Sequence, residues 1–129
     1  MSKKLLSRSD KLVLFVYNAD SSFFNQVGDL IHKTVSPKTY QCNLCGLTYS
    51  GYNMKSEWKD FISSLAIKTV FLHKDEFIKQ YPDKQNTSFP IAFIKEGNFL
   101  NEFISTDEIN KQKRLTDLEA LVKEKIAKL

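Results

Sequence analysis

The sequence has few of the features that mark secreted or membrane proteins. It holds only two cysteines in 129 residues, too few for the disulfide framework of a small secreted domain. The apolar run over residues 12–17 is too short for a signal core or a membrane-spanning helix. We therefore expect a soluble, cytoplasmic protein with no membrane partner.

Several functional classes also lack their sequence signals. Internal repeats and low-complexity tracts are missing, and so is the GxxxxGK[ST] motif of P-loop nucleotide-binding proteins. The net charge of +4 is mild, and the basic residues do not form a stripe with interleaved aromatic residues. We therefore expect no nucleic-acid partner.

What is present is the composition of an ordinary globular domain. Hydrophobic residues make up 42% of the chain and charged residues 26%, close to the averages for soluble proteins. A chain of 129 residues suits one compact domain with a core of its own. We predict a single domain over residues 1–129, in which residues 1–10 form a flexible arm.

The hydrophobic pattern predicts a succession of short strands and helices. Residues 12–17 form a continuous apolar run, typical of a strand buried on both faces. The rest of the pattern predicts a helix over 22–35, an irregular segment over 37–53, a helix over 54–65, a strand over 68–72, a short helix from 73–75 to about 81, strands over 89–95 and 99–104, a short helix over about 107–112 capped by Thr106, and a final helix that starts with a capping box at residues 116–119.

The predicted order is therefore β-α-(loop)-α-β-α-β-β-α. A helical crossover makes the first two strands parallel, and the turn at residues 96–98 makes the last two an antiparallel hairpin. With Phe89-Pro90 opening a strand, this order resembles the thioredoxin fold, best over residues 89–129. The resemblance implies an α/β three-layer sandwich, with a mixed four-stranded sheet covered by helices on both faces. It also implies a cis peptide bond before Pro90.

The front half departs from that resemblance at the usual active site. Thioredoxin-like proteins carry a CxxC after the first strand, where this chain has Asp20-Ser21-Ser22-Phe23-Phe24. Ser21 and Phe24 thus stand at the two cysteine positions, so the usual attacking thiol is missing. The whole chain also looks like a group of small bacterial proteins that share the Thr-Tyr-Gln-Cys-Asn-Leu-Cys stretch.

Both cysteines lie in the segment 37–53, where we expect them to follow a helix and lie in a loop. A Cys42-x-x-Cys45 pair can close a disulfide in a short ring and act as a reactive dithiol. A second hypothesis is one knuckle of a zinc ribbon, but structural zinc takes four ligands, and we expect His32 and His73 to lie too far apart to supply the others. The third is a pair of reduced, packed structural cysteines. We expect no cofactor and no metal.

Polar residues follow the predicted parallel strands and suggest a binding cleft. Ligands of open α/β sheets bind beyond the carboxyl ends of such strands, where Asn18, Asp20, Ser21 and His73 are expected. The thioredoxin-like resemblance implies that Pro90 lies beside them. The simpler alternative is that Asp20 or Ser21 only caps a helix and that His73 is a surface residue.

Three functional hypotheses follow. The favoured one is a thioredoxin-fold protein whose catalytic residues are Cys42 and Cys45, at most a thiol–disulfide oxidoreductase with a protein or small thiol as partner. It predicts that the segment 37–53 returns toward Pro90, and sulfurs far from Pro90 and sealed from solvent would count against it. The alternatives are a non-catalytic binding or adaptor module and a zinc-knuckle protein.

Overall fold

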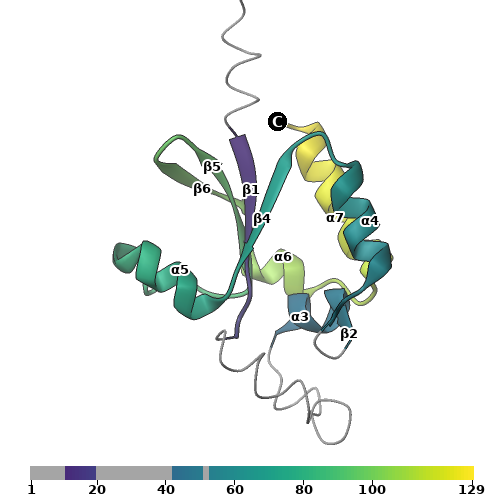
Figure 1. Ribbon diagram of the computed structural model, residues 1–129, viewed down its shortest axis with the longest axis horizontal. Helices are drawn as coiled ribbons and strands as arrows, with labels where there is room; N and C mark the ends of the chain where they lie inside the picture. The colour runs from purple at the N-terminus through teal and green to yellow at the C-terminus, as the bar shows by residue number, and fades with distance from the viewer. Residues whose placement is uncertain (1–10, 20–41, 51–52) are drawn as a thin grey trace, which may run out of the picture.

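A mixed four-stranded sheet forms the centre of the protein (Figure 1). The computed structural model describes residues 11–19, 42–50 and 53–129. The strand order is β4-β1-β5-β6, with β1 parallel to β4 and antiparallel to β5, and with β5 antiparallel to β6. The strands span Lys11–Val16 (β1), Lys68–Leu72 (β4), Ile91–Glu96 (β5) and Phe99–Ile104 (β6).

Strand β1 is central and buried on both faces, as its apolar run predicts. Successive side chains of a strand point to opposite faces. Phe15 and Tyr17 therefore belong to one hydrophobic cluster, while Leu14 and Val16 belong to the other. Because all four are at most 3% exposed, both faces of the sheet need a helical cover.

Helices supply that cover on both sides (Figure 1). On one face, α4 (Ser56–Ser64) contributes Trp58 and α7 (Leu115–Ala127) contributes Leu118 to the larger cluster. On the other, α5 (Lys74–Gln80) packs Phe77 against the sheet. The predicted α/β class and mixed four-stranded sheet are thus confirmed. None of the described helices has the length and apolar character needed to cross a bilayer.

Short elements complete the described parts of the chain. The turn of the β5–β6 hairpin has Gly97 at φ 62°, a left-handed conformation that glycine adopts without steric cost. The Phe89–Pro90 peptide bond is cis, as the resemblance implies. The remaining elements are α3 (Asn43–Thr48), β2 (Tyr49–Ser50), β3 (Asn53–Met54), the 3-10 helix η1 (Pro82–Lys84) and α6 (Thr106–Asn110).

Three predicted helix starts are wrong: α4 begins at Ser56 and not at residue 54, and α6 begins at Thr106, the residue predicted to cap it. The third is that of α7. Helix α7 begins at Leu115, before the predicted capping box, and its N-cap Arg114 makes no side-chain cap bond. Leu115 is buried, so packing starts the helix there. The capping box belongs to α6, where Ser105 Oγ accepts from the Glu108 N–H at 3.1 Å and Glu108 Oε1 accepts from the Ser105 N–H at 2.9 Å.

The segment 37–53 is more regular than predicted. Its described part holds α3 and the two short paired strands β2 and β3. The predicted arm over residues 1–10 and the predicted helix over residues 22–35 lie outside the described residues.

Candidate functional site

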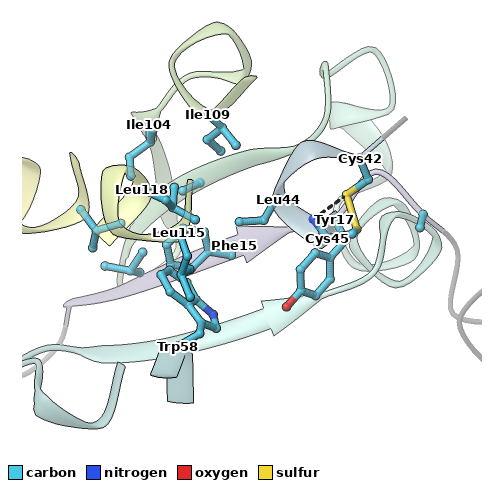
Figure 2. Close-up of a cluster of buried hydrophobic side chains, with 14 of the residues drawn as sticks. Phe15, Tyr17, Cys42, Leu44, Cys45, Trp58, Ile104, Ile109, Leu115 and Leu118 are labelled. Carbon is cyan, nitrogen blue, oxygen red and sulfur yellow. Dashed lines mark hydrogen bonds between the residues drawn. A yellow bond between two sulfur atoms is a disulfide. The ribbon is translucent and has the colours of Figure 1, made fainter. Parts of the chain in front are cut away.

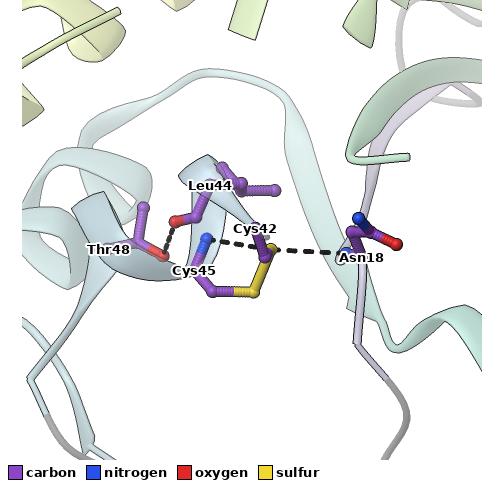
Figure 3. The surroundings of a disulfide bond; sticks show 5 residues. All are labelled: Asn18, Cys42, Leu44, Cys45 and Thr48. Atoms are coloured by element: carbon purple, nitrogen blue, oxygen red, sulfur yellow. Dashed lines mark hydrogen bonds between the residues drawn. A yellow bond between two sulfur atoms is a disulfide. The ribbon is translucent and has the colours of Figure 1, made fainter. Parts of the chain in front are cut away.

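The two cysteines form a disulfide at the start of α3 (Figure 3). Their Cα atoms are 5.2 Å apart, within the usual range for a disulfide. Cys42 is the N-cap of α3, and Cys45 lies in its first turn. The prediction that the pair lies in a loop is therefore wrong. It failed because cysteine is an unusual cap residue and because the bonds of Asn18 and Asn43 join α3 to distant parts of the chain.

Two backbone N–H groups donate to the sulfur of Cys42. The N–H of Cys45 lies 3.2 Å from Cys42 Sγ, and the N–H of Asn18 lies 3.3 Å from it (Figure 3). A hydrogen bond to a charged acceptor is stronger than one to a neutral acceptor. These donors therefore stabilise a thiolate at Cys42 more than they stabilise the disulfide sulfur.

The disulfide lies at the end of the sheet where Pro90 lies. Asn18 comes two residues after the end of β1. The last residue of β1, Val16, pairs with Ile91, which follows Pro90 directly. The segment that carries Cys42 thus returns to the sheet end expected for it.

Both cysteines are buried, at 2% exposure for Cys42 and 0% for Cys45. They belong to the larger hydrophobic cluster, beside Tyr17 and Leu44 (Figure 2). Thiol exchange requires the attacking sulfur to reach a disulfide sulfur. A local movement, of the start of α3 or of the groups that cover it, must therefore precede the reaction with an external thiol.

Of the predicted cleft residues, His73 also lies at this end of the sheet. It follows β4 and is the N-cap of α5, where its N–H and its Nδ1 each lie 2.8 Å from Glu76 Oε1. Its ring centroid lies 5.7 Å from that of Tyr17, a neighbour of the cysteines in the same cluster. His73 therefore helps to start α5 and packs near the disulfide. Asp20 and Ser21 lie outside the described residues.

A pocket of about 370 Å³ opens at the same sheet end, where its lining residues Ser88 and Ile91 flank Phe89-Pro90. Ile91 and Phe93 contribute to it from the face that α5 covers. The Oγ1 of Thr106, another lining residue, is buried and has no hydrogen-bond partner in the described structure. The rest of the lining is polar or charged: Lys84, Thr87, Ser88, Glu102, Ser105 and Asp107.

The zinc-knuckle hypothesis finds no donor set within residues 11–19, 42–50 and 53–129. No three His, Cys, Asp or Glu side chains gather there in an arrangement that could hold a metal ion. Cys42 and Cys45 are joined to each other, whereas a cysteine binds zinc as a thiolate. His32 lies outside the described residues.

Asn43, between the two cysteines, is a residue that the sequence analysis missed. Its side-chain amide donates to the backbone carbonyls of Ile109 at 2.8 Å and of Gln112 at 2.9 Å. The available signal was the residue type, because a side-chain amide carries two donors and readily bonds backbone groups. Its partners could not be predicted, since they lie 66 and 69 positions away.

Comparison of the chain with protein-family models, with curated proteins and with solved structures finds no match.

Proposed function

We propose that this chain is a thioredoxin-like thiol–disulfide exchange protein in which Cys42 and Cys45 cycle between a disulfide and a dithiol. One observation carries the proposal: the fold directs two N–H donors at Cys42 Sγ, the environment that a reactive thiolate needs. The Cys45 N–H bond also caps α3, so the Asn18 N–H is the donor that capping does not explain.

The arrangement of the elements supports the thioredoxin-like part of the proposal. A central first strand has a parallel neighbour on one side and an antiparallel hairpin on the other, and a helix closes the chain. The disulfide lies beyond the carboxyl end of that first strand, where the resemblance places reactive cysteines. Here they come from residues 42–45, because Ser21 and Phe24 occupy the usual positions.

The proposed reaction moves two electrons. The Cys42 thiolate attacks a partner disulfide, which forms a mixed disulfide and releases the first partner thiolate. The Cys45 thiol gives up its proton and attacks Cys42 Sγ, which closes the Cys42–Cys45 bond and releases the second partner thiolate. The two protein thiols are oxidised, and the partner disulfide is reduced to two thiols. The reverse sequence, driven by a dithiol or by two small thiols, restores the reduced pair.

Equilibration of the folded protein in buffers of reduced and oxidised glutathione tests the proposal. Alkylation of free thiols followed by mass spectrometry should show a reversible two-electron transition. The fluorescence of Trp58, the single tryptophan, reports in the same samples that the fold is kept. A disulfide that is reduced only when the protein unfolds would refute the proposal. The Cys42→Ser, Cys45→Ser double variant is the control for glutathione effects unrelated to the pair.

The pocket lined by Ile91, Phe93 and Thr106 favours a second candidate, a non-catalytic binding module. Its lining offers hydroxyl groups and charges of both signs above an apolar base. On this hypothesis the disulfide only holds α3 in place. The Cys42→Ser, Cys45→Ser double variant would then restore the phenotype of a deletion strain as fully as the wild type does.

A further inference from the structure

Asn43 joins the disulfide turn to a helix far along the chain. It is half-buried, and its amide nitrogen donates to two backbone carbonyls, Ile109 O in α6 and Gln112 O just beyond that helix. Both partners are acceptors, so only the NH₂ end of the amide can face them. Asn43, one of the two residues between the cysteines, is thus fixed by two hydrogen bonds at 2.8 and 2.9 Å.

These bonds have no equivalent elsewhere in α3. Among the described residues, Asn43 is the only side chain of α3 that donates hydrogen bonds to another helix region. The Thr48 hydroxyl bonds only to Leu44 within α3 itself. Further restraints on the turn among the described residues include the bond from the Asn18 N–H to Cys42 Sγ and the burial of Leu44.

A local movement has to expose the sulfurs before the disulfide can react. Cys42 and Cys45 are at most 2% exposed, so the closed state excludes an attacking thiol. A movement of the turn away from α6 breaks the bonds from Asn43. The stability of these bonds therefore contributes to how often the reactive state forms.

We propose that Asn43 is a latch, a positioning residue whose two bonds to the α6 region hold the Cys42–Cys45 turn closed and limit the access of thiols. The inference rests on the proposed thiol–disulfide exchange. It assigns to Asn43 the control of how often the disulfide is accessible. Loss of the net stabilisation that one or two hydrogen bonds provide should raise the population of the open state by about 10-fold. The rate of reduction should rise by the same factor.

Reduction by dithiothreitol measures the latch without a natural partner. One reagent thiolate attacks a protein sulfur and forms a mixed disulfide. The second reagent thiol then closes a cyclic disulfide and releases the protein dithiol. We expect Asn43→Ala to be reduced about 10-fold faster than the wild type in the folded state, with alkylation and mass spectrometry as the readout. Alanine is a good helix former, so the change does not weaken α3 by its own conformational preference.

The control variant weakens α6 while it leaves Asn43 intact. Ser105→Ala removes the side-chain acceptor that caps the Glu108 N–H at the opposite end of α6. We expect this variant to be reduced at close to the wild-type rate. Equal acceleration by Ser105→Ala and Asn43→Ala would overturn the inference, because general loosening of α6 would then account for both.

Asn43→Asp adds a second measurement, the pH dependence of the reduction rate. A purely structural role of Asn43 would not produce this dependence. The aspartate has nearly the shape of asparagine, but its carboxylate accepts hydrogen bonds and cannot donate them. A phosphine reductant is suited to acidic solution; it takes up oxygen from water to form the phosphine oxide as the disulfide becomes two thiols. We expect the rate of Asn43→Asp relative to the wild type to be high at neutral pH. It should fall as the carboxyl becomes protonated and regains one donor.

The possible failures are distinguishable. If Asn43→Ala and Asn43→Asp are folded and are reduced at the wild-type rate, the latch is refuted while the proposed exchange stands. If all variants are reduced only at their rate of global unfolding, the proposed exchange fails as well. If Asn43→Ala does not fold, the relative rate of Asn43→Asp at neutral and acidic pH decides: a ratio that does not change with pH refutes the latch.

Discussion

The backbone N–H of Asn18 lies 3.3 Å from the Sγ of Cys42, 24 positions later in the chain. The donor belongs to the main chain, so any residue except proline can supply it at position 18. The environment of the sulfur thus depends on where β1 ends and where α3 begins.

This relationship predicts that the two thiols ionise differently. With Cys45→Ser, the remaining Cys42 thiol should form its thiolate at a lower pH than the Cys45 thiol does in the Cys42→Ser variant. The reason is that the Asn18 and Cys45 N–H groups point at the sulfur of residue 42. Ultraviolet absorbance of the thiolate against pH measures both variants without depending on access to the buried sulfurs. Ionisation of Cys45 at the lower pH would contradict the assignment.

Trp58 should be the most costly side chain of α4 to truncate. It is fully buried, and its ring lies 5.8 Å from Phe15 and 5.5 Å from Phe61. Trp58→Ala should lower the free energy of unfolding by about 3–5 kcal/mol in urea titrations. Trp58→Phe should cost clearly less, because it keeps a ring and the indole N–H has no hydrogen-bond partner in the described structure to lose. Equal losses in the two variants would show that ring packing is not the main contribution of Trp58 to the free energy of unfolding.

Glu119 should destabilise the fold progressively as the pH rises. Burial, followed by the negative charge of Glu57, raises the pKa of the Glu119 carboxyl. The folded state therefore binds this proton more tightly than the unfolded state does, and stability falls as pH rises from the ordinary carboxyl pKa through the raised one. Glu119→Gln removes the charge at nearly constant shape. Its free energy of unfolding relative to the wild type should increase from weakly acidic to neutral pH, and a constant difference would refute the prediction.

Glu108 should show the opposite dependence. Its carboxylate lies 2.7 Å from the Lys125 Nζ and also accepts from the Ser105 N–H. The hydrogen bond from Lys125, then that from Ser105, lowers the pKa of Glu108. The stabilisation is therefore present above the ordinary carboxyl pKa and is lost as pH falls through the lowered one.

Glu108→Gln should accordingly destabilise the protein at neutral pH and have little effect in acid. The carboxylate is 37% exposed, so solvent screening keeps the loss below about 1 kcal/mol. Glutamine can still take the third position of a capping box, so the ion pair is the main interaction removed. Urea unfolding of Glu108→Gln at neutral and acidic pH is the measurement. A Lys125→Met variant should show the same pH dependence, and its failure to do so would point to an effect of the cap.

The elements predicted well are those whose signals are local. The apolar run of β1 predicts a strand buried on both faces, and a short turn with Gly97 predicts the β5–β6 hairpin. Helix α3 was missed because cysteine is not one of the usual N-cap residues and because other supports of the helix are distant in sequence. A cysteine sulfur caps its start, and the partners of Asn43 come 66 and 69 positions later. The start of α7 was misplaced because the burial of Leu115 outweighed a nearby capping pattern.

The sequence by itself determined the alternation of buried residues, the hairpin and a cysteine spacing short enough for a disulfide. Side-chain period, turn chemistry and ring size are properties of neighbouring residues, so the linear pattern contains them. Only the tertiary structure decided that Cys42 lies at the end of β1, that both sulfurs are buried and that Asn43 bonds to the α6 region. These contacts join residues 24 to 69 positions apart, and such residues meet only when the sheet and its helices pack together.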